Sequence, residues 1–337
     1  MNRDNRSSGT VAIRLGALGD MIMFLPVLHA MHQRFQCKID VVTAGPWSPF
    51  VLSHSPYVGR VEALDTTKRW AGLLSRRQRQ VVAWLKADPP KRTYLFEQSR
   101  KADHLLQRAG IDRHYVVHAA DRPSQPNEHQ TDYHRRLLGA EHDHTVPQLD
   151  HRRLDIDEAR QWLRTIGATG SKLVLLQPGN KRTMRPGRLD RASNHKHWPT
   201  ERWSSLAAAV ADSDPQIKVL ICGVPAEQAL AQDIAQRSCS DRVLAVADQL
   251  PLPRLFALST LADAMISVDT GPAHVAAAAG CPLVVMFGQT NPDCFAPRGV
   301  AQVEIVDAGG SGLTTLPVAA IMAAFENLSP RRENNET

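Results

Sequence analysis

The sequence predicts a two-domain α/β protein in which each domain contains a doubly wound parallel sheet. The chain has 337 residues, which is long for a single domain. Strand-like apolar runs alternate with helical patterns, and the alternation restarts cleanly after residue 168. The stretch 264–288 has the pattern of a strand, a tight turn, a helix and a second strand, which is the right-handed βαβ unit of parallel sheets.

The composition is that of a globular protein with a moderate excess of positive charge. Hydrophobic residues make up 43% of the chain, and the formal net charge is +6. No apolar run reaches the length of a membrane span, and the polar N-terminus lacks the apolar core of a signal peptide, so we expect a cytoplasmic protein. Five cysteines, an odd number without a C-x-x-C pair, indicate reduced thiols.

The first expected strand, VAIRL at 11–15, is followed by the turn GALGD. Gly16 and Gly19 let the backbone approach a ligand, and Asp20 stands where a helix N-cap is expected. A cap is the commoner role of such an Asp, but the carboxyl end of the first strand is also where α/β domains bind ligands. The other elements expected in this half are strands at 38–45 and 55–65 and helices at 21–35, 128–144 and 154–167.

After residue 168, strand and helix patterns follow one another without interruption. The expected strands are at 173–177, 218–223, 242–247, 264–269 and 282–288, and the expected helices are at 200–213, 226–238, 253–263, 272–280 and 318–328. We therefore divide the chain into a first domain at 1–168, a second at 169–312, and a C-terminal helix and tail at 313–337 that can pack back on the first domain.

Polar residues gather where the expected strand at 264–269 ends. Asp269 and Thr270 follow its apolar run, and Gly271, Pro272, Ala273 and His274 begin a helix. Unpaired N–H groups at a helix N-terminus suit an anion, and parallel sheets bind ligands at the carboxyl ends of their strands. A helix cap with a surface histidine is the alternative for any single residue, but the clustering favours a binding site.

A basic loop follows the strand LVLLQPGN. Its six basic residues stand against the single acid Asp190 and are Lys181, Arg182, Arg185, Arg188, Arg191 and Lys196. A nucleotide diphosphate would supply the missing negative charge, and a solvated surface loop is the alternative. Glu227 follows the next strand, where it can bond ribose hydroxyls or serve the helix dipole, and the sequence does not decide between these roles.

A second basic region spans 68–113, with twelve Lys or Arg against four Asp or Glu. Trp70, Trp84 and Tyr94 lie among these charges, a mixture also found on nucleic-acid-binding surfaces. No zinc-finger spacing or RNP pattern accompanies it, so a solvated helix face or another anionic partner is favoured.

Four motifs together resemble glycosyltransferase family 9, whose best-known members are the ADP-heptose:lipopolysaccharide heptosyltransferases. They are RLGALGD, KHWP, CGVPAE and SVDTGPAHVAAAAGCPLVVMFG, and the resemblance runs from Val11 to about Arg298. It implies the GT-B fold, an α/β architecture of two Rossmann-like doubly wound domains facing across a cleft.

The resemblance gives each candidate residue a role. Asp20 would be the general base, and Lys196 would hold the diphosphate leaving group. The donor site would be lined by Gln177, Gly179, Asn180, Arg182, Thr183, Glu227, Asp269, Thr270, Gly271, Pro272, Ala273 and His274, with Glu227 at the ribose. The acceptor site would involve Gly19, Lys68, Arg69, Arg135 and Arg136. A carboxylate on one domain and a cationic pocket on the other suit a single displacement with inversion, with no metal or cofactor.

The expected partners are a nucleotide sugar, with ADP-heptose as the first candidate, an anionic glycolipid or glycan acceptor of the lipopolysaccharide-core kind, and transiently the inner face of the cytoplasmic membrane. Nucleic acid is not expected. The loop at 181–194 is longer and more basic than in the known heptosyltransferases, which leaves the sugar open. The alternatives are another nucleotide sugar or a protein acceptor, a GT-B epimerase or hydrolase, and a non-catalytic nucleotide or polyanion binder. A dehydrogenase is disfavoured because G-x-G-x-x-G is absent.

Overall fold

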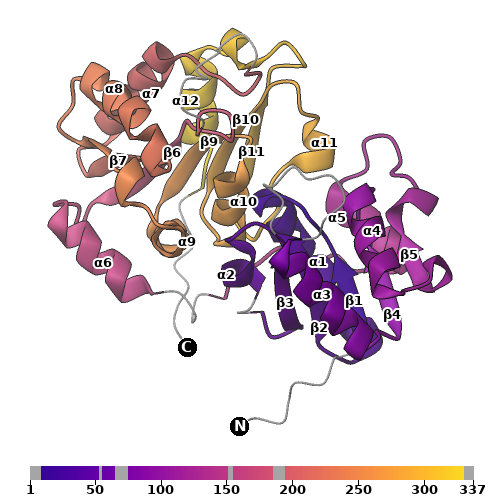
Figure 1. Ribbon diagram of the computed structural model, residues 1–337. Helices are drawn as coiled ribbons and strands as arrows, with labels where there is room; N and C mark the ends of the chain where they lie inside the picture. The colour runs from indigo at the N-terminus through magenta and orange to yellow at the C-terminus, as the bar shows by residue number, and fades with distance from the viewer. Residues whose placement is uncertain (1–8, 53–54, 65–74, 151–154, 185–193, 330–337) are drawn as a thin grey trace. The chain divides into compact units, whose positions relative to one another are not determined.

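The computed structural model describes residues 9–52, 55–64, 75–150, 155–184 and 194–329. The chain forms two compact units, Met1–Thr145 and Val146–Thr337 (Figure 1). The sequence analysis placed the division at 168 instead. The difference is helix α6 (Ile156–Thr165), whose Trp162 and Leu163 pack into the hydrophobic core of the second unit.

The first unit contains a parallel sheet in the order β3-β2-β1-β4-β5. Its strands are β1 (Thr10–Ile13), β2 (Ile39–Ala44), β3 (Val58–Leu64), β4 (Arg92–Leu95) and β5 (Val116–His118). The expected strands at 11–15, 38–45 and 55–65 are therefore confirmed as β1, β2 and β3. The sequence analysis did not anticipate β4 and β5.

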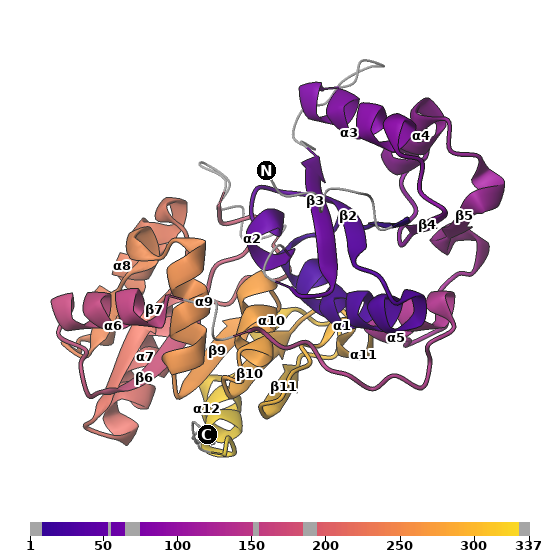
Figure 2. The ribbon, with the colours of Figure 1, turned by 90° about the horizontal axis from the view of Figure 1, so that it is seen from below.

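Helices cover both faces of this sheet (Figure 2). They are α1 (Leu18–Phe35), α2 (Ser48–Leu52), α3 (Arg76–Ala87), α4 (Arg100–Ala109) and α5 (Gln130–Leu138). Helices α3 and α4 pack with the strands around Ile13 and Leu105, while α1 packs beside α5 on the other face. Helix α5 is shorter than the expected 128–144, because His129 caps its start and Gly139, at a φ of 69°, ends it.

The second unit contains a parallel sheet in the order β11-β10-β9-β6-β7-β8. Its strands are β6 (Lys172–Gln177), β7 (Ile217–Ile221), β8 (Val243–Ala245), β9 (Ala264–Val268), β10 (Leu283–Phe287) and β11 (Val303–Asp307). The βαβ unit expected at 264–288 is confirmed, with β9 and β10 paired in parallel. The remaining expected strands of this half are confirmed as well, and only β11 was not anticipated.

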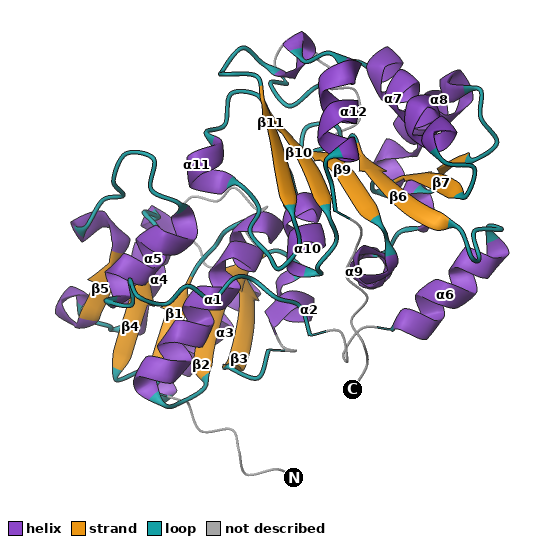
Figure 3. Ribbon diagram, turned by 180° about the vertical axis from the view of Figure 1, so that it is seen from behind, coloured by secondary structure: helices purple, strands orange, loops and turns teal. Residues whose placement is uncertain are grey.

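The helices of the second unit also lie on both faces of its sheet (Figure 3). They are α6, α7 (Thr200–Ser213), α8 (Gln228–Ser238), α9 (Leu252–Leu261), α10 (Gly271–Ala278), α11 (Pro292–Phe295) and α12 (Val318–Glu326). Helices α7, α8 and α12 share one apolar cluster with the sheet, and α6, α9 and α10 share the other. In the part of the chain that is described, no helix is long and apolar enough to span a bilayer.

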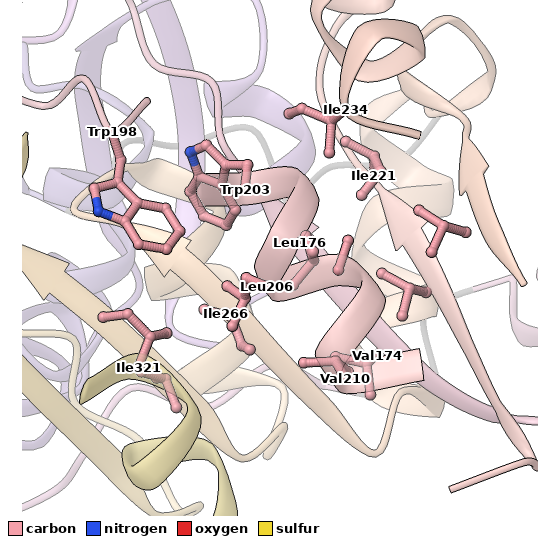
Figure 4. Packing of buried hydrophobic residues seen from close by; sticks show 14 of the residues in the cluster. Val174, Leu176, Trp198, Trp203, Leu206, Val210, Ile221, Ile234, Ile266 and Ile321 are labelled. Carbon is pink, nitrogen blue, oxygen red and sulfur yellow. The ribbon is translucent and has the colours of Figure 1, made fainter. Parts of the chain in front are cut away.

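The cluster beneath α7 fixes the segment that leads into it (Figure 4). Trp198 and Trp203 are almost fully buried and pack edge to face, and the Trp198 indole N–H donates to the Leu316 carbonyl at 3.0 Å. Ile321 of α12 is fully buried in the same cluster. The final helix therefore packs on the core of its own unit, and the expectation that it packs back on the first domain stays a prediction.

Each sheet has one topological switch point, where successive strands begin to add on the opposite side. In the first sheet it lies between β1 and β4, and in the second between β6 and β9. Open α/β sheets bind ligands in the crevice outside the carboxyl ends of the two strands that flank a switch point. The residues that follow β1, β4, β6 and β9 are therefore where functional side chains are expected.

Candidate functional site

Three charged side chains meet at the switch point of the first sheet. Arg14 follows β1 and donates from Nη2 to Asp20 Oδ1 at 2.9 Å. Its Nη1 lies 3.7 Å from Glu97 Oε2, and Glu97 follows β4. The side chains of Arg14, Asp20 and Glu97 are 12%, 27% and 14% exposed, so Asp20 is the most accessible of the three.

Asp20 is the third residue of α1 and not its N-cap, because the helix begins earlier and Ala17 occupies the cap position. Its Oδ2 accepts the backbone N–H of Ala17 at 2.6 Å. A Cβ on Gly16 would collide with the Asp20 side chain, reaching within 3.0 Å of Oδ2. Glycine at that position therefore lets the strand-to-helix turn close around the carboxylate.

The sequence analysis missed Arg14 and Glu97. Glu97 Oε2 accepts the backbone N–H of Leu15 at 2.7 Å, which ties the ends of β1 and β4 together. Burial raises the pKa of Glu97, an effect that the Leu15 N–H and Arg14 oppose and nearby Asp20 reinforces. The spacing between Arg14 and Glu97 along the chain carries no local signal, and only the pairing of β1 with β4 brings them together.

The proposed acceptor residues differ in their burial and in their side-chain partners. Arg135 is buried, is paired with Asp143, and donates to the Thr145 carbonyl. Arg136 bonds both carboxylate oxygens of Glu128, at 2.7 and 2.8 Å. Both guanidinium groups are thus engaged inside the first unit. Gly19 is buried in the first turn of α1, and Lys68 and Arg69 lie outside the described residues.

In the second unit, Lys196 lies at the switch point beside Asp269. Its Nζ donates to Asp269 Oδ2 at 2.6 Å and to the Asp269 carbonyl at 2.8 Å. Asp269 directly follows β9, and its side chain is 8% exposed, against 27% for Lys196. The ammonium is therefore held at the strand end with part of its surface open to solvent.

Glu227 lies beside the loop that follows β6. Its Oε2 accepts the backbone N–H of Val224 at 3.0 Å, and the Thr183 hydroxyl donates to its Oε1. Burial raises the pKa of Glu227, opposed by these hydrogen bonds. Gly179 and Gly223 lie against the carboxylate so closely that a Cβ on Gly179 would overlap it and one on Gly223 would come within 2.9 Å of Oε2.

The loop after β6 is organised by Asn180. Its Oδ1 accepts the backbone N–H of Arg182 at 2.9 Å, and its backbone N–H donates to the Thr183 hydroxyl at 2.7 Å. Gln177, buried at the end of β6, donates from Nε2 to the Gly179 carbonyl at 3.3 Å. The structure thus brings Gln177, Gly179, Asn180, Arg182, Thr183 and Glu227 together. The predicted basic residues Arg185, Arg188 and Arg191 lie outside the described residues.

The N-terminus of α10 adjoins the Lys196–Asp269 pair. Thr270 is the N-cap residue, and within the described structure its side chain makes no capping hydrogen bond. Gly271 and Pro272 open the first turn, while Ala273 and His274 are buried beneath it.

His195 is a further neighbour that the sequence analysis missed. Burial lowers its pKa, helped by the positive charges of Arg182 and Lys196 and opposed by Asp269. Arg182 and Lys196 therefore both act on the His195 ring, and Lys196 is held beside the α10 N-terminus, where a cation and a helix start suit an anionic group.

The comparisons with known proteins bear on the family and the fold of this chain. The family described as glycosyltransferase family 9 (heptosyltransferase) matches residues 127–310, more than half of the chain. The chain therefore belongs to glycosyltransferase family 9.

Among curated proteins, lipopolysaccharide heptosyltransferase 1 of Escherichia coli O18:K1:H7 (strain RS218 / NMEC) is 33% identical over 131 residues. That match covers 39% of this chain and 39% of the relative, so the alignment spans well under half of the relative's length.

Solved structures resemble the whole chain. A family 9 glycosyl transferase from Veillonella parvula DSM 2008 has a TM-score of 0.77 at 17% identity and covers 97% of both chains. The E. coli ADP-heptose lps heptosyltransferase II has a TM-score of 0.72 at 17% identity, covering 94% of this chain and 97% of that one. At these identities the likeness bears on the fold alone, and it confirms the predicted GT-B class.

Proposed function

We propose that this protein is an inverting glycosyltransferase that moves a heptose from ADP-heptose to an anionic glycan of the lipopolysaccharide-core kind. The observation that carries the proposal is the grouping of Lys196, Asp269 and Glu227 at the switch point of the second sheet, in a chain of family 9. The similar E. coli proteins are described as lipopolysaccharide and ADP-heptose heptosyltransferases, which supports these substrates.

The second unit is proposed to hold the donor. Lys196 and the α10 N-terminus meet the diphosphate, where the negative charge grows as the leaving group departs. Glu227, fixed by Thr183 and Val224, accepts hydrogen bonds from the ribose hydroxyls. Because this cationic pocket meets the diphosphate charge, the proposed reaction needs neither a metal ion nor a cofactor.

The first unit is proposed to activate the acceptor. The Asp20 carboxylate takes the proton of an acceptor hydroxyl while that oxygen attacks the anomeric carbon of the heptose. The bond from the anomeric carbon to the diphosphate oxygen breaks, and ADP leaves with the electron pair. A single displacement of this kind inverts the anomeric configuration.

The acceptor is proposed to be anionic because the basic region at 68–113 belongs to the first unit. All of its described Lys and Arg residues, from Arg76 to Arg113, are exposed. Lys68 and Arg69 stay in the proposal, whereas the internal pairs of Arg135 and Arg136 give those two a structural role. We place the protein in the cytoplasm. There the same positive charge is expected to attract it transiently to the anionic inner leaflet of the membrane.

The test combines binding and transfer. Nucleoside diphosphates carrying adenine, uracil or guanine are compared by thermal shift and calorimetry, since a ligand that binds only the folded state raises its stability. ADP-heptose is then incubated with lipopolysaccharide core lacking heptose. We expect preferential stabilisation by ADP and heptose transfer that survives EDTA.

The competing functions give different results. Release of ADP at the same rate without acceptor would indicate a hydrolase, and binding of ADP without turnover would indicate a non-catalytic binder. Stronger stabilisation by another nucleoside diphosphate would indicate that the donor carries that nucleotide and is not ADP-heptose. No stabilisation by any nucleoside diphosphate would refute the proposed donor site.

A further inference from the structure

We propose that Glu97 is a positioning residue for the transfer reaction: it shares the Arg14 guanidinium with Asp20 and thereby sets how strongly that cation holds the catalytic carboxylate. The inference rests on the proposed function, in which Asp20 is the general base. Glu97 itself lies behind Arg14 and acts through it.

The contacts make Arg14 a bridge between two strand ends. One terminal nitrogen, Nη2, donates to Asp20 at 2.9 Å. The other, Nη1, donates to the Phe96 carbonyl at 3.3 Å and faces Glu97 at 3.7 Å. The Leu15 N–H, at 2.7 Å, fixes the Glu97 carboxylate in this place. The Arg14 guanidinium therefore faces two carboxylates, Asp20 and Glu97, and the Leu15 backbone N–H holds the Glu97 carboxylate in place.

The surroundings keep this arrangement rigid. Phe96, next to Glu97, is buried and packs edge to face against Phe24 of α1 and His134 of α5. Arg14 and Glu97 are both mostly buried, so solvent screens their interaction less than it would at the surface. Asp20, being twice as exposed as either, presents the cluster to a ligand.

The charge balance gives Glu97 its effect on Asp20. With both carboxylates ionised, the single positive charge of Arg14 is divided between them. Replacing Glu97 with a neutral residue leaves the whole charge acting on Asp20, which stabilises its ionised form and makes it a weaker base.

Other ionisable groups facing the cluster come from α5. Burial and the nearby Arg14 lower the pKa of His134 well below its ordinary value, so this ring is neutral. Burial raises the pKa of Tyr133, which keeps the phenol neutral as well. Among the described residues around the cluster, Glu97 is therefore the group that can balance Arg14.

The test is a double-mutant cycle read as a pH profile of kcat/KM. For Glu97→Gln we expect the acid limb to move to lower pH by about half a unit to one unit. We also expect the plateau to fall by about two- to fivefold, as a weaker base predicts. Arg14→Gln should move the acid limb the opposite way. In the double variant the limb should stay where Arg14→Gln alone places it, because Glu97 acts on Asp20 through Arg14.

Glu128→Gln is the matched control. Glu128 also bonds an arginine and accepts a backbone N–H, from Gln125 at 2.8 Å, but it lies away from the strand ends. The pH profile of kcat/KM for Glu128→Gln should match that of the wild type. Melting temperatures for all variants separate a loss of folding from a loss of basicity.

The outcomes distinguish this inference from the proposed function. An unshifted acid limb in Glu97→Gln, or shifts that simply add in the double variant, would overturn the role of Glu97 even if Asp20→Asn is inactive. If Asp20→Asn keeps its activity, the proposed base itself is wrong, and the position of the acid limb no longer reports on Asp20.

Discussion

At the switch point of the first sheet one arginine lies between two carboxylates and the carboxylate of Asp20 is the most exposed group, whereas at that of the second sheet Lys196 is paired with the buried Asp269 and the ammonium is the more exposed partner. The two sheets share their parallel topology and the position of their functional residues. They differ in the sign of the charge that they leave available. An exposed carboxylate suits proton removal and an exposed ammonium suits a diphosphate, so the proposed function assigns the two sites complementary parts of one transfer reaction.

The sharpest way to break this comparison is to neutralise Asp20. Asp20→Asn keeps the shape of the side chain and one acceptor oxygen, so it retains the bond from either Ala17 or Arg14 but not both, and it cannot take a proton. We expect kcat to fall about a thousandfold with ADP affinity unchanged, which single-turnover assays and calorimetry would measure.

Asp132→Asn is the control for that change, because Asp132 also lies in the first turn of a helix of the first unit. It should transfer heptose at the wild-type rate. Turnover of Asp20→Asn within a few-fold of wild type would remove the chemical contrast between the two sheets.

On the other sheet, Lys196→Ala should weaken ADP binding and slow transfer by about a hundredfold, since the ammonium interacts more strongly with the developing diphosphate than with the ester. The matched control is Lys172→Ala. Lys172 forms a similar pair with Asp214 at 2.7 Å, but it begins β6 instead of following the strand ends. Equal ADP affinity in both variants would place the diphosphate elsewhere, with Arg182 as the next candidate.

A subtler change tests whether the second site depends on its glycine. Gly179→Ala adds a methyl group that overlaps the Glu227 carboxylate, so Glu227 must move. We expect about tenfold weaker binding of ADP and a loss of about 1–3 kcal/mol in stability, as overpacking usually causes.

Gly170→Ala provides the reference for Gly179→Ala. Its methyl group enters open space, although a φ of 73° strains the backbone. Gly170→Ala should lower the stability of the protein without changing its affinity for ADP. If Gly179→Ala behaves in the same way, Glu227 takes no part in nucleotide binding.

The second half of the fold was well predicted because most of its strands lie in continuous apolar runs. Helix α7 was found at its observed bounds, and β9, α10 and β10 follow a continuous pattern of buried residues. By contrast, β4 has the sequence RTYL, β5 has only three residues, and β11 alternates between partly buried and exposed positions. Such short or half-exposed strands have too little periodicity to be recognised.

The candidate site was predicted only where a motif marks it. Asp20, Lys196 and Asp269 stand in recognisable turns after strands. Glu97 stands in none, and its link to Leu15 crosses 82 residues through the pairing of β1 with β4. Finding it requires the strand order, which local sequence does not encode. The burial of Arg135 is likewise a tertiary property, since its neighbour Arg136 looks the same in sequence.

The smallest expected effect concerns two glutamates whose stability should depend on pH in opposite ways. Burial raises the pKa of Glu227 above its ordinary value of 4.5, so the folded protein binds this proton more tightly than the unfolded chain, and stability falls as pH rises through the folded pKa. The hydrogen bond from Arg136 lowers the pKa of Glu128, so the contribution of Glu128 to stability is present above pH 4.5 and is lost as pH falls through the lowered value.

Relative to wild type, Glu227→Gln should gain stability at neutral pH and lose that gain toward pH 4, whereas Glu128→Gln should be less stable at neutral pH and approach wild type in acid. Each difference is expected to be on the order of 1 kcal/mol, measurable by urea unfolding at several pH values. Parallel pH dependence in the two variants would show that burial at the second switch point does not set the titration of Glu227.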